Sequence, residues 1–277
     1  MTGNLNKEDK VERLLSDLWN PIHPDIQKMF ELINGNEEAL YHFMKNYWFF
    51  NNRFAAGVCA LTANIHNSLG FDGHNERGSL IAANVYKACD HEYHEIINGK
   101  EYTHAQLSKY FLRNLDALVF TQPFHRSGSF APSDEIKKIS YKVMDAYQAY
   151  MSKEEIESVD YKRLAKGLGF HMASEFIAAA EYHTITTFSA FQFITLYNKM
   201  QKPTNETGFE NISPWHWVSI HATVEIEHFA ASLKSYRDSD GLFDKNDVLD
   251  GIRLFQEISK EFMDITEKEI KELITKN

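Results

Sequence analysis

Two histidines and a glutamate are spaced so that one face of a helix would present all three. The stretch from 221 to 228 reads His-Ala-Thr-Val-Glu-Ile-Glu-His. Successive helical residues turn by about 100°, which places Glu225 about 40° from His221 on one side and His228 about 20° away on the other. Converging imidazole and carboxylate groups are suitable ligands for a first-row transition metal. Glu227 lies about 120° from this stripe and is excluded.

The sequence around this stripe is mostly apolar, which does not suit a simple surface face. The apolar neighbours are Trp215, Trp217, Val218, Val224, Ile226, Phe229 and Ala230. Polar side chains in such a helix need hydrogen-bond partners or a bound ligand. Metal binding is the favoured interpretation. The alternative is that these side chains lie on the surface or that each makes its own separate hydrogen bonds.

A second candidate face lies in the long helical run from 161 to 200, which contains GLGFHMASEFIAAAEYHT. Glu175 shares this face with His171 and Tyr182, at about 40° and 20° by the same helical geometry. Small alanines between Glu175 and Tyr182 leave room for a metal or a substrate. Glu181 lies about 120° from Glu175 and is expected to be structural or exposed. The alternative for Glu175 is a buried ion pair.

A third group of candidate ligands lies in the stretch Asp-His-Glu-Tyr-His-Glu from 90 to 95. Glu92 and Glu95 are three residues apart and would be neighbours on a helix. His104 opens the next predicted helix after a short turn. We therefore expect one of the two glutamates, together with His104, to complete the ligand set. The alternative is that 90–95 is a solvated helix end.

The composition limits the classes of function. The chain has 277 residues and a net charge of −10, without a basic block, which argues against a nucleic-acid partner. It has a polar beginning and no long apolar run, so no membrane span or signal peptide is expected. The two cysteines, Cys59 and Cys89, form no CxxC motif. They predict a reduced, cytoplasmic protein.

Helical periodicity recurs along the whole chain, and alternating strand patterns do not. We predict an all-α fold in a single domain over 1–277, with about seven core helices and frayed ends at about 1–8 and 272–277. Asn98-Gly99 is interpreted as a helix C-terminal signal. The predicted helices cover 7–18, 25–33, 37–68 with a kink or break near 51–52, 78–97, 104–118, 134–151, a short helix after 152, 161–200, 213–236 and 245–276.

The order of these elements resembles the haem-oxygenase-like di-iron oxidases, within the wider group of thiamin-salvage proteins and pyrroloquinoline-quinone synthase. That family has a Glu, a His near the start of the next helix, a Glu on a central helix, and then His-x3-Asp/Glu-x2-His. The matching residues here are Glu92 or Glu95, His104, Glu175, His221, Glu225 and His228. Glu225 stands where the family often has Asp, and it is still a competent ligand.

The resemblance implies a non-haem di-iron centre, with a manganese–iron pair as the alternative. O2 would be the co-substrate, and a peroxo-diferric intermediate would oxidise a small amino-acid-like or carboxylic-acid-like molecule. Arg53 and His171 are the candidate substrate contacts. Tyr182 is the candidate catalytic residue, as a proton donor or an oxidisable group, and the alternative is a core tyrosine with a satisfied hydroxyl. The family often forms dimers, so a homodimer is a further expectation.

Three other functions remain open. A metal-free thiamin-salvage-like hydrolase or a cofactorless oxidase could share the fold. A haem oxygenase would need a proximal histidine in an early helix, such as His23 or His42, but would leave the later ligand set unexplained. A non-enzymatic binding or signalling protein is the third possibility. Metal analysis would separate these functions from the di-iron interpretation.

Overall fold

The computed structural model describes residues 10–120 and 131–276, which are almost entirely helical. Seven of the eleven helices in this part have 13 residues or more, so the prediction of an all-α fold with about seven core helices is confirmed. The elements are α1 (Lys10–Leu18), α2 (Pro24–Ile33), α3 (Glu37–Phe71), α4 (Asn75–Tyr93), β1 (Glu95–Ile97), β2 (Lys100–Tyr102), α5 (His104–Val119), α6 (Asp134–Ala146), α7 (Lys153–Glu157), α8 (Tyr161–Gln192), α9 (Ile194–Met200), α10 (His216–Asp238) and α11 (Lys245–Lys276).

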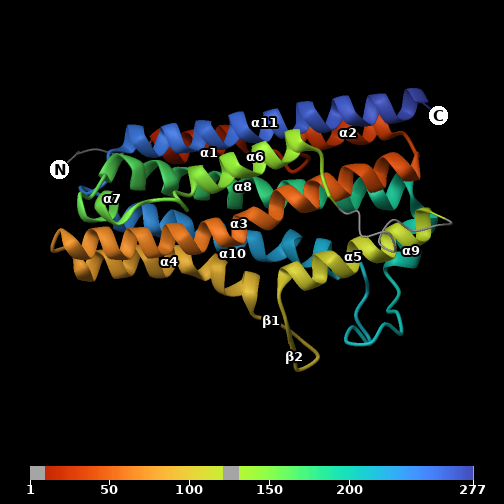
Figure 1. Ribbon diagram of the computed structural model, residues 1–277, viewed down its shortest axis with the longest axis horizontal. Helices are drawn as coiled ribbons and strands as arrows, with labels where there is room; N and C mark the ends of the chain where they lie inside the picture. The colour runs from red at the N-terminus through yellow and green to blue at the C-terminus, as the bar shows by residue number, and fades with distance from the viewer. Residues whose placement is uncertain (1–9, 121–130, 277) are drawn as a thin grey trace, which may run out of the picture.

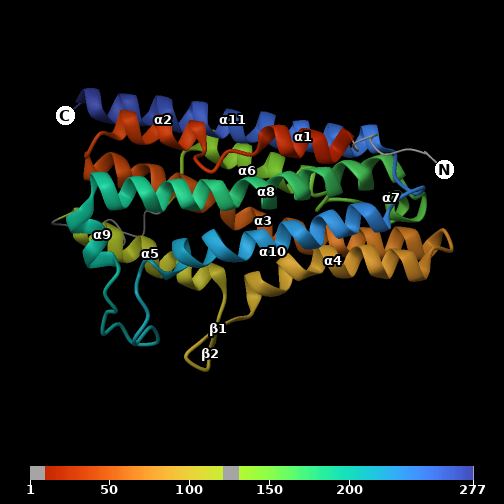
Figure 2. The same ribbon diagram turned by 180° about the vertical axis from the view of Figure 1, so that it is seen from behind.

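The long helices lie side by side in an elongated bundle (Figures 1 and 2). Helices α1, α2 and α11 cover one side, and α4, α5 and α10 cover the opposite side. Helices α3, α6 and α8 lie between them. The β1–β2 hairpin and the segment between α9 and α10 project from the same side of the bundle. The candidate ligands therefore come from the central helix α8 and from the layer of α4, α5 and α10.

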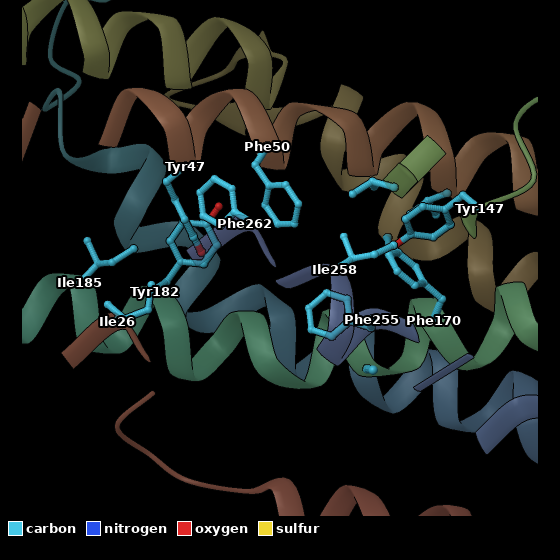
Figure 3. Close-up of a cluster of buried hydrophobic side chains, with 14 of the residues drawn as sticks. Ile26, Tyr47, Phe50, Tyr147, Phe170, Tyr182, Ile185, Phe255, Ile258 and Phe262 are labelled. Atoms are coloured by element: carbon cyan, nitrogen blue, oxygen red, sulfur yellow. The ribbon is translucent and has the colours of Figure 1, made fainter. Parts of the chain in front are cut away.

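Aromatic side chains hold α3, α8 and α11 together (Figure 3). Phe50 of α3 stacks on Phe262 of α11, with ring centroids 4.3 Å apart. Tyr47 of α3 packs edge to face against Tyr182 of α8, at 5.6 Å. All four side chains are buried. This packing fixes the face of α8 that carries the candidate ligand Glu175.

Two glycines allow α8 and α11 to approach closely. A Cβ atom added to Gly169 of α8 would lie 2.0 Å from the carbonyl oxygen of Val248. A Cβ atom added to Gly251 of α11 would lie 2.0 Å from the carbonyl oxygen of Lys166. Backbone meets backbone at both points, so a larger residue at either position would force the two helices apart.

The predicted helix over 78–97 is wrong at its end, because α4 stops at Tyr93 and residues 95–102 form a hairpin. Asn98 and Gly99 both have positive φ angles, 53° and 76°. This conformation suits a two-residue turn that matches the twist of paired strands, and Asn-Gly is a strong signal for it. Glu95 therefore lies on a strand opposite Tyr102 rather than on a helix with Glu92.

Other helices differ from the prediction in extent or continuity, and α6, for example, ends at Ala146 rather than at 151. The helix expected over 161–200 is interrupted at Phe193, which has a φ of −126° and separates α8 from α9. Helix α3 runs without a break through Asn51 and Asn52, whose side-chain amides donate to the carbonyls of the residues four positions earlier. Helix α11 continues to Lys276, where fraying was expected. The expected frayed start lies outside the described residues.

The prediction of reduced cysteines is wrong. Cys59 of α3 and Cys89 of α4 form a disulfide, with their Cα atoms 5.7 Å apart. The thirty-residue separation in sequence gave no sign of this contact, which arises from the packing of α3 against α4. The cytoplasmic assignment rested partly on reduced thiols and loses that support. Among the described helices, none is long and apolar enough to cross a membrane.

Candidate metal centre

Six of the predicted ligands form two groups of buried or half-buried side chains, each able to hold a metal ion. Within each group one ligand atom from every residue lies within 4.8 Å of the others. The first group combines residues of α4, α5 and α10, and the second combines residues of α8 and α10. The first group is Glu92, His104 and His221, and the second is Glu175, Glu225 and His228.

The first group centres on one oxygen of Glu92. This Oε1 lies 3.1 Å from Nδ1 of His104 and 3.8 Å from Nε2 of His221. The two imidazole rings are 4.5 Å apart between centroids. The two ring nitrogens of the buried His104 each face a carboxylate, Glu92 at 3.1 Å and Glu95 at 3.7 Å, without the alignment of a hydrogen bond. A buried imidazole beside a carboxylate and a second imidazole fits a metal ligand.

The second group centres on Nδ1 of His228. This nitrogen lies 3.1 Å from Oε2 of Glu225 and 3.2 Å from Oε2 of Glu175. All three side chains are buried. Two carboxylates this close in a buried place repel each other unless a proton or a cation lies between them.

Glu225 lies between the two groups. Its Oε2 belongs to the second group, while its Oε1 lies 3.9 Å from Nε2 of His221 in the first. All six candidate ligands line one cavity of about 50 Å³. The carboxylate of Glu225 would therefore be within reach of an ion in either group.

Without a metal, the first group would hold a proton on His104. Burial on its own would raise the pKa of Glu92, but the charge of His104 outweighs it and holds that pKa well below its ordinary value. Burial would lower the pKa of His104, but the paired Glu92 raises it to about 10. Burial and the charge of His104 lower the pKa of His221. The pair Glu92–His104 is thus charged at neutral pH, while His221 stays neutral.

The second group would hold two protons. Burial raises the pKa of Glu225 to about 8, and the neighbouring charge of Glu175 adds to the effect. Burial opposes ionisation of Glu175, but the adjacent His171 brings its pKa well below the ordinary value. Burial disfavours a charged His228, but its hydrogen bonds to Glu175 and Glu225 raise its pKa to about 10. Protons therefore occupy the places at which cations would bind.

The structure separates the two alternative glutamates. Glu92 lies inside the first group, whereas Glu95 lies outside both groups. Oε2 of Glu95 is 3.7 Å from Nε2 of His104, on the side of the ring away from Glu92. A carboxylate in that place would orient a ligand histidine rather than bind the ion itself. The hairpin turn that sequence reasoning missed produces this arrangement.

Neither predicted substrate contact lies in the cavity. Arg53 is exposed, and its guanidinium lies over the ring of Phe49 at 4.9 Å. His171 is fully buried behind Glu175, with Nδ1 3.2 Å from Oε1 of that carboxylate. Arg53 projects from the outer face of α3, and His171 is a partner of a candidate ligand. Neither residue lines the cavity, and their role as substrate contacts stays a prediction.

Tyr182 does line the cavity, as expected, and its ring stacks on His221 at 4.5 Å. The cavity also contains Glu181, which was expected to be structural or exposed. Glu181 is buried and accepts a 2.8 Å hydrogen bond from the hydroxyl of Tyr47. Ser174, Ala178 and Glu181 follow the i, i+4, i+7 spacing of one helical face, so Glu181 lies at one edge of the stripe that faces the cavity and Glu175 at the other.

Comparisons with known proteins identify a shared fold. No protein-family model and no curated protein matches the chain. Among solved structures, the chain is similar to a CADD-like protein of unknown function from Nostoc punctiforme. The TM-score is 0.61 at 15% sequence identity, and the alignment covers 94% of this chain and 95% of that chain. Fold and site together define an all-α protein with two carboxylate–histidine groups suited to metal ions.

Proposed function

We propose that this protein is an O2-dependent oxidase or oxygenase of the haem-oxygenase-like di-iron family. The two groups would hold two iron ions, and a manganese–iron pair suits the same nitrogen and oxygen ligands. The observation that carries the proposal is Glu225, which directs one carboxylate oxygen toward each group. Two bound iron ions would supply the activation of O2.

The protein would contribute a small space around these ions. Apolar side chains of Phe50, Val58 and Trp217 line the cavity beside the ligands and limit the access of water. A volume of about 50 Å³ holds only a few water-sized molecules. It therefore suits two ions with O2 or water.

A second cavity offers room for the organic substrate. It has a volume of about 170 Å³ and lies among residues of α2, α8 and α11 and of the segment before α2. Phe255 lines both cavities. We place a small amino-acid-like or carboxylic-acid-like molecule there, with its reacting end at Phe255.

Metal analysis tests the proposal. Protein purified without oxygen and loaded with Fe(II) is expected to retain two iron ions per chain after desalting. It should then consume O2 when a substrate is supplied from panels of amino acids, fatty acids and aromatic acids. Protein that retains no metal would instead favour a metal-free thiamin-salvage-like enzyme, a cofactorless enzyme or a binding protein.

Tyr182→Phe is expected to keep both ions and to change the rate of substrate-dependent O2 consumption. The phenylalanine ring can still stack on His221, but the hydroxyl, which interacts with Tyr47, is lost. A lost hydroxyl should cost about 1 kcal/mol of stability through its hydrogen bond. Metal content, O2 uptake and thermal unfolding would be measured on the same preparation.

Tyr110→Phe is the matched control. Tyr110 is also buried, and its hydroxyl bonds to Thr204 and to the carbonyl of Ile212, away from the cavity. This variant should lose a similar amount of stability and keep the wild-type O2 uptake. Equal O2 uptake in both variants would make Tyr182 a core residue without a role in the chemistry.

A further inference from the structure

His228 makes different contacts through its two ring nitrogens. Nδ1 faces the carboxylates of Glu175 and Glu225. Nε2 lies 2.8 Å from Nδ1 of His91, the residue that precedes Glu92 at the end of α4. The side chain of His228 is 2% exposed, and His91 is half-buried. His91 therefore stands between a buried candidate ligand and the surface.

The short distance between the two nitrogens determines their protonation in a metal-bound site. A hydrogen bond between two imidazoles needs one N–H donor and one nitrogen with a free lone pair. An ion beside Glu175 and Glu225 would take the lone pair of Nδ1 of His228. The Nε2–H of His228 must then donate to Nδ1 of His91.

His221 provides the counterpart on the same helix. Its Nδ1 lies 2.7 Å from the carbonyl oxygen of Trp217, one turn earlier in α10, so Nδ1–H donates and Nε2 is left for an ion. The two histidines of α10 thus offer opposite nitrogens to the cavity. For His221 the outer acceptor is the helix's own backbone, and for His228 it is a side chain from α4.

We infer that His91 is a positioning residue for the second metal ion. It accepts the Nε2–H of His228 and thereby fixes the tautomer and the ring orientation that aim Nδ1 at the ion. Outer hydrogen-bond partners of this kind fix metal-bound histidines, and their loss typically weakens metal binding about 10–100-fold. The inference rests on the proposed metal centre. His91 itself lies outside both ligand groups.

The position of His91 gives α4 a part in both metal sites. Glu92 would bind the first ion directly, while the adjacent His91 would orient a ligand of the second. A purely structural His91 would instead only satisfy a buried nitrogen of His228. That role would affect the stability of the metal-free protein and leave the affinity of the folded protein for metal unchanged.

The test is a titration of the full-length protein with Co(II). The visible absorption of the bound Co(II) measures how much ion is bound at each step. His91→Phe keeps a ring of similar size but removes the acceptor, and one of the two ions should bind about 10–100-fold more weakly. His91→Asn keeps an acceptor near the place of Nδ1 and should restore most of the affinity. His94→Phe, at the exposed end of the same helix, is the matched control and should bind as wild type does.

Each outcome decides the question. Wild-type affinity for both ions in His91→Phe would overturn the role of His91 while leaving the metal centre intact. Equal weakening in the Phe and Asn variants would mean that the acceptor nitrogen is not what positions His228, and would overturn the inference. A lower melting temperature of the metal-free His91→Phe protein, with wild-type affinity for both ions, would make the residue structural. Wild-type protein that binds no Co(II) would overturn both the inference and the proposed function. If the protein binds two Co(II) ions but its iron-loaded form does not react with O2, only the oxidase proposal would be overturned.

Discussion

Glu225→Ala is expected to remove both metal ions, whereas His221→Ala and His228→Ala are each expected to remove one. The reason is geometric, because Glu225 has one oxygen within reach of each group and each histidine belongs to one group. Metal content after anaerobic loading and desalting measures the effect. Circular dichroism checks that the variants remain helical.

Glu227→Ala is the control for this series. Glu227 lies on the same helix but is exposed, 3.5 Å from Lys87 on the outer face. It should keep two ions per chain. Full retention of metal in Glu225→Ala would contradict the bridging assignment, and full retention in both histidine variants would contradict the ligand assignment.

Loading two ions at pH 7 is expected to release about three protons, one each from His104, His228 and Glu225. The pKa values of the two histidines are raised to about 10 and that of Glu225 to about 8, so all three groups are mainly protonated at pH 7. Metal ligands must be deprotonated to bind, so metal affinity depends on pH. The metal affinity should therefore rise with pH. Each displaced proton contributes a factor of about ten for every pH unit.

Calorimetric titration with Co(II) between pH 6 and pH 7.5 measures this release, because repeating it in buffers of different ionisation enthalpy counts the protons. The joint binding constant for two ions should rise about a thousandfold per pH unit in this window. Above pH 8 the dependence should weaken, since Glu225 has then lost its proton. Binding without proton release would mean that these residues are not the ligands.

Local spacing was enough to predict the part of the site that lies on single helices. His221, Glu225 and His228 lie within two turns of α10, and the helical period alone brings them to one face. Glu175 was found for a similar reason, from its place among small residues on α8. Such patterns do not depend on how the helices pack.

Sequence reasoning failed where the arrangement depends on chain reversal or on packing. Glu92 could not be separated from Glu95 until the Asn98–Gly99 turn showed where α4 ends. Arg53 was expected to contact a substrate, yet it is exposed on α3 and does not line the cavity. His91 and His228 are 137 positions apart in the sequence, and no local sequence pattern predicts their contact.

The disulfide of α3 and α4 has a consequence for the metal-free protein. The bond between Cys59 and Cys89 closes a ring of chain around the α3–α4 turn, and loop-closure entropy for such a ring disfavours the unfolded state by roughly 3–4 kcal/mol. Val58 and Ala88, the residues next to the two cysteines, line the metal cavity, and Glu92 follows Cys89 by three residues. The cross-link therefore holds this wall of the cavity in place before any ion arrives. Metal binding then costs less conformational entropy, because this wall is already ordered. The disulfide-bonded protein should therefore bind metal more tightly than protein with free thiols.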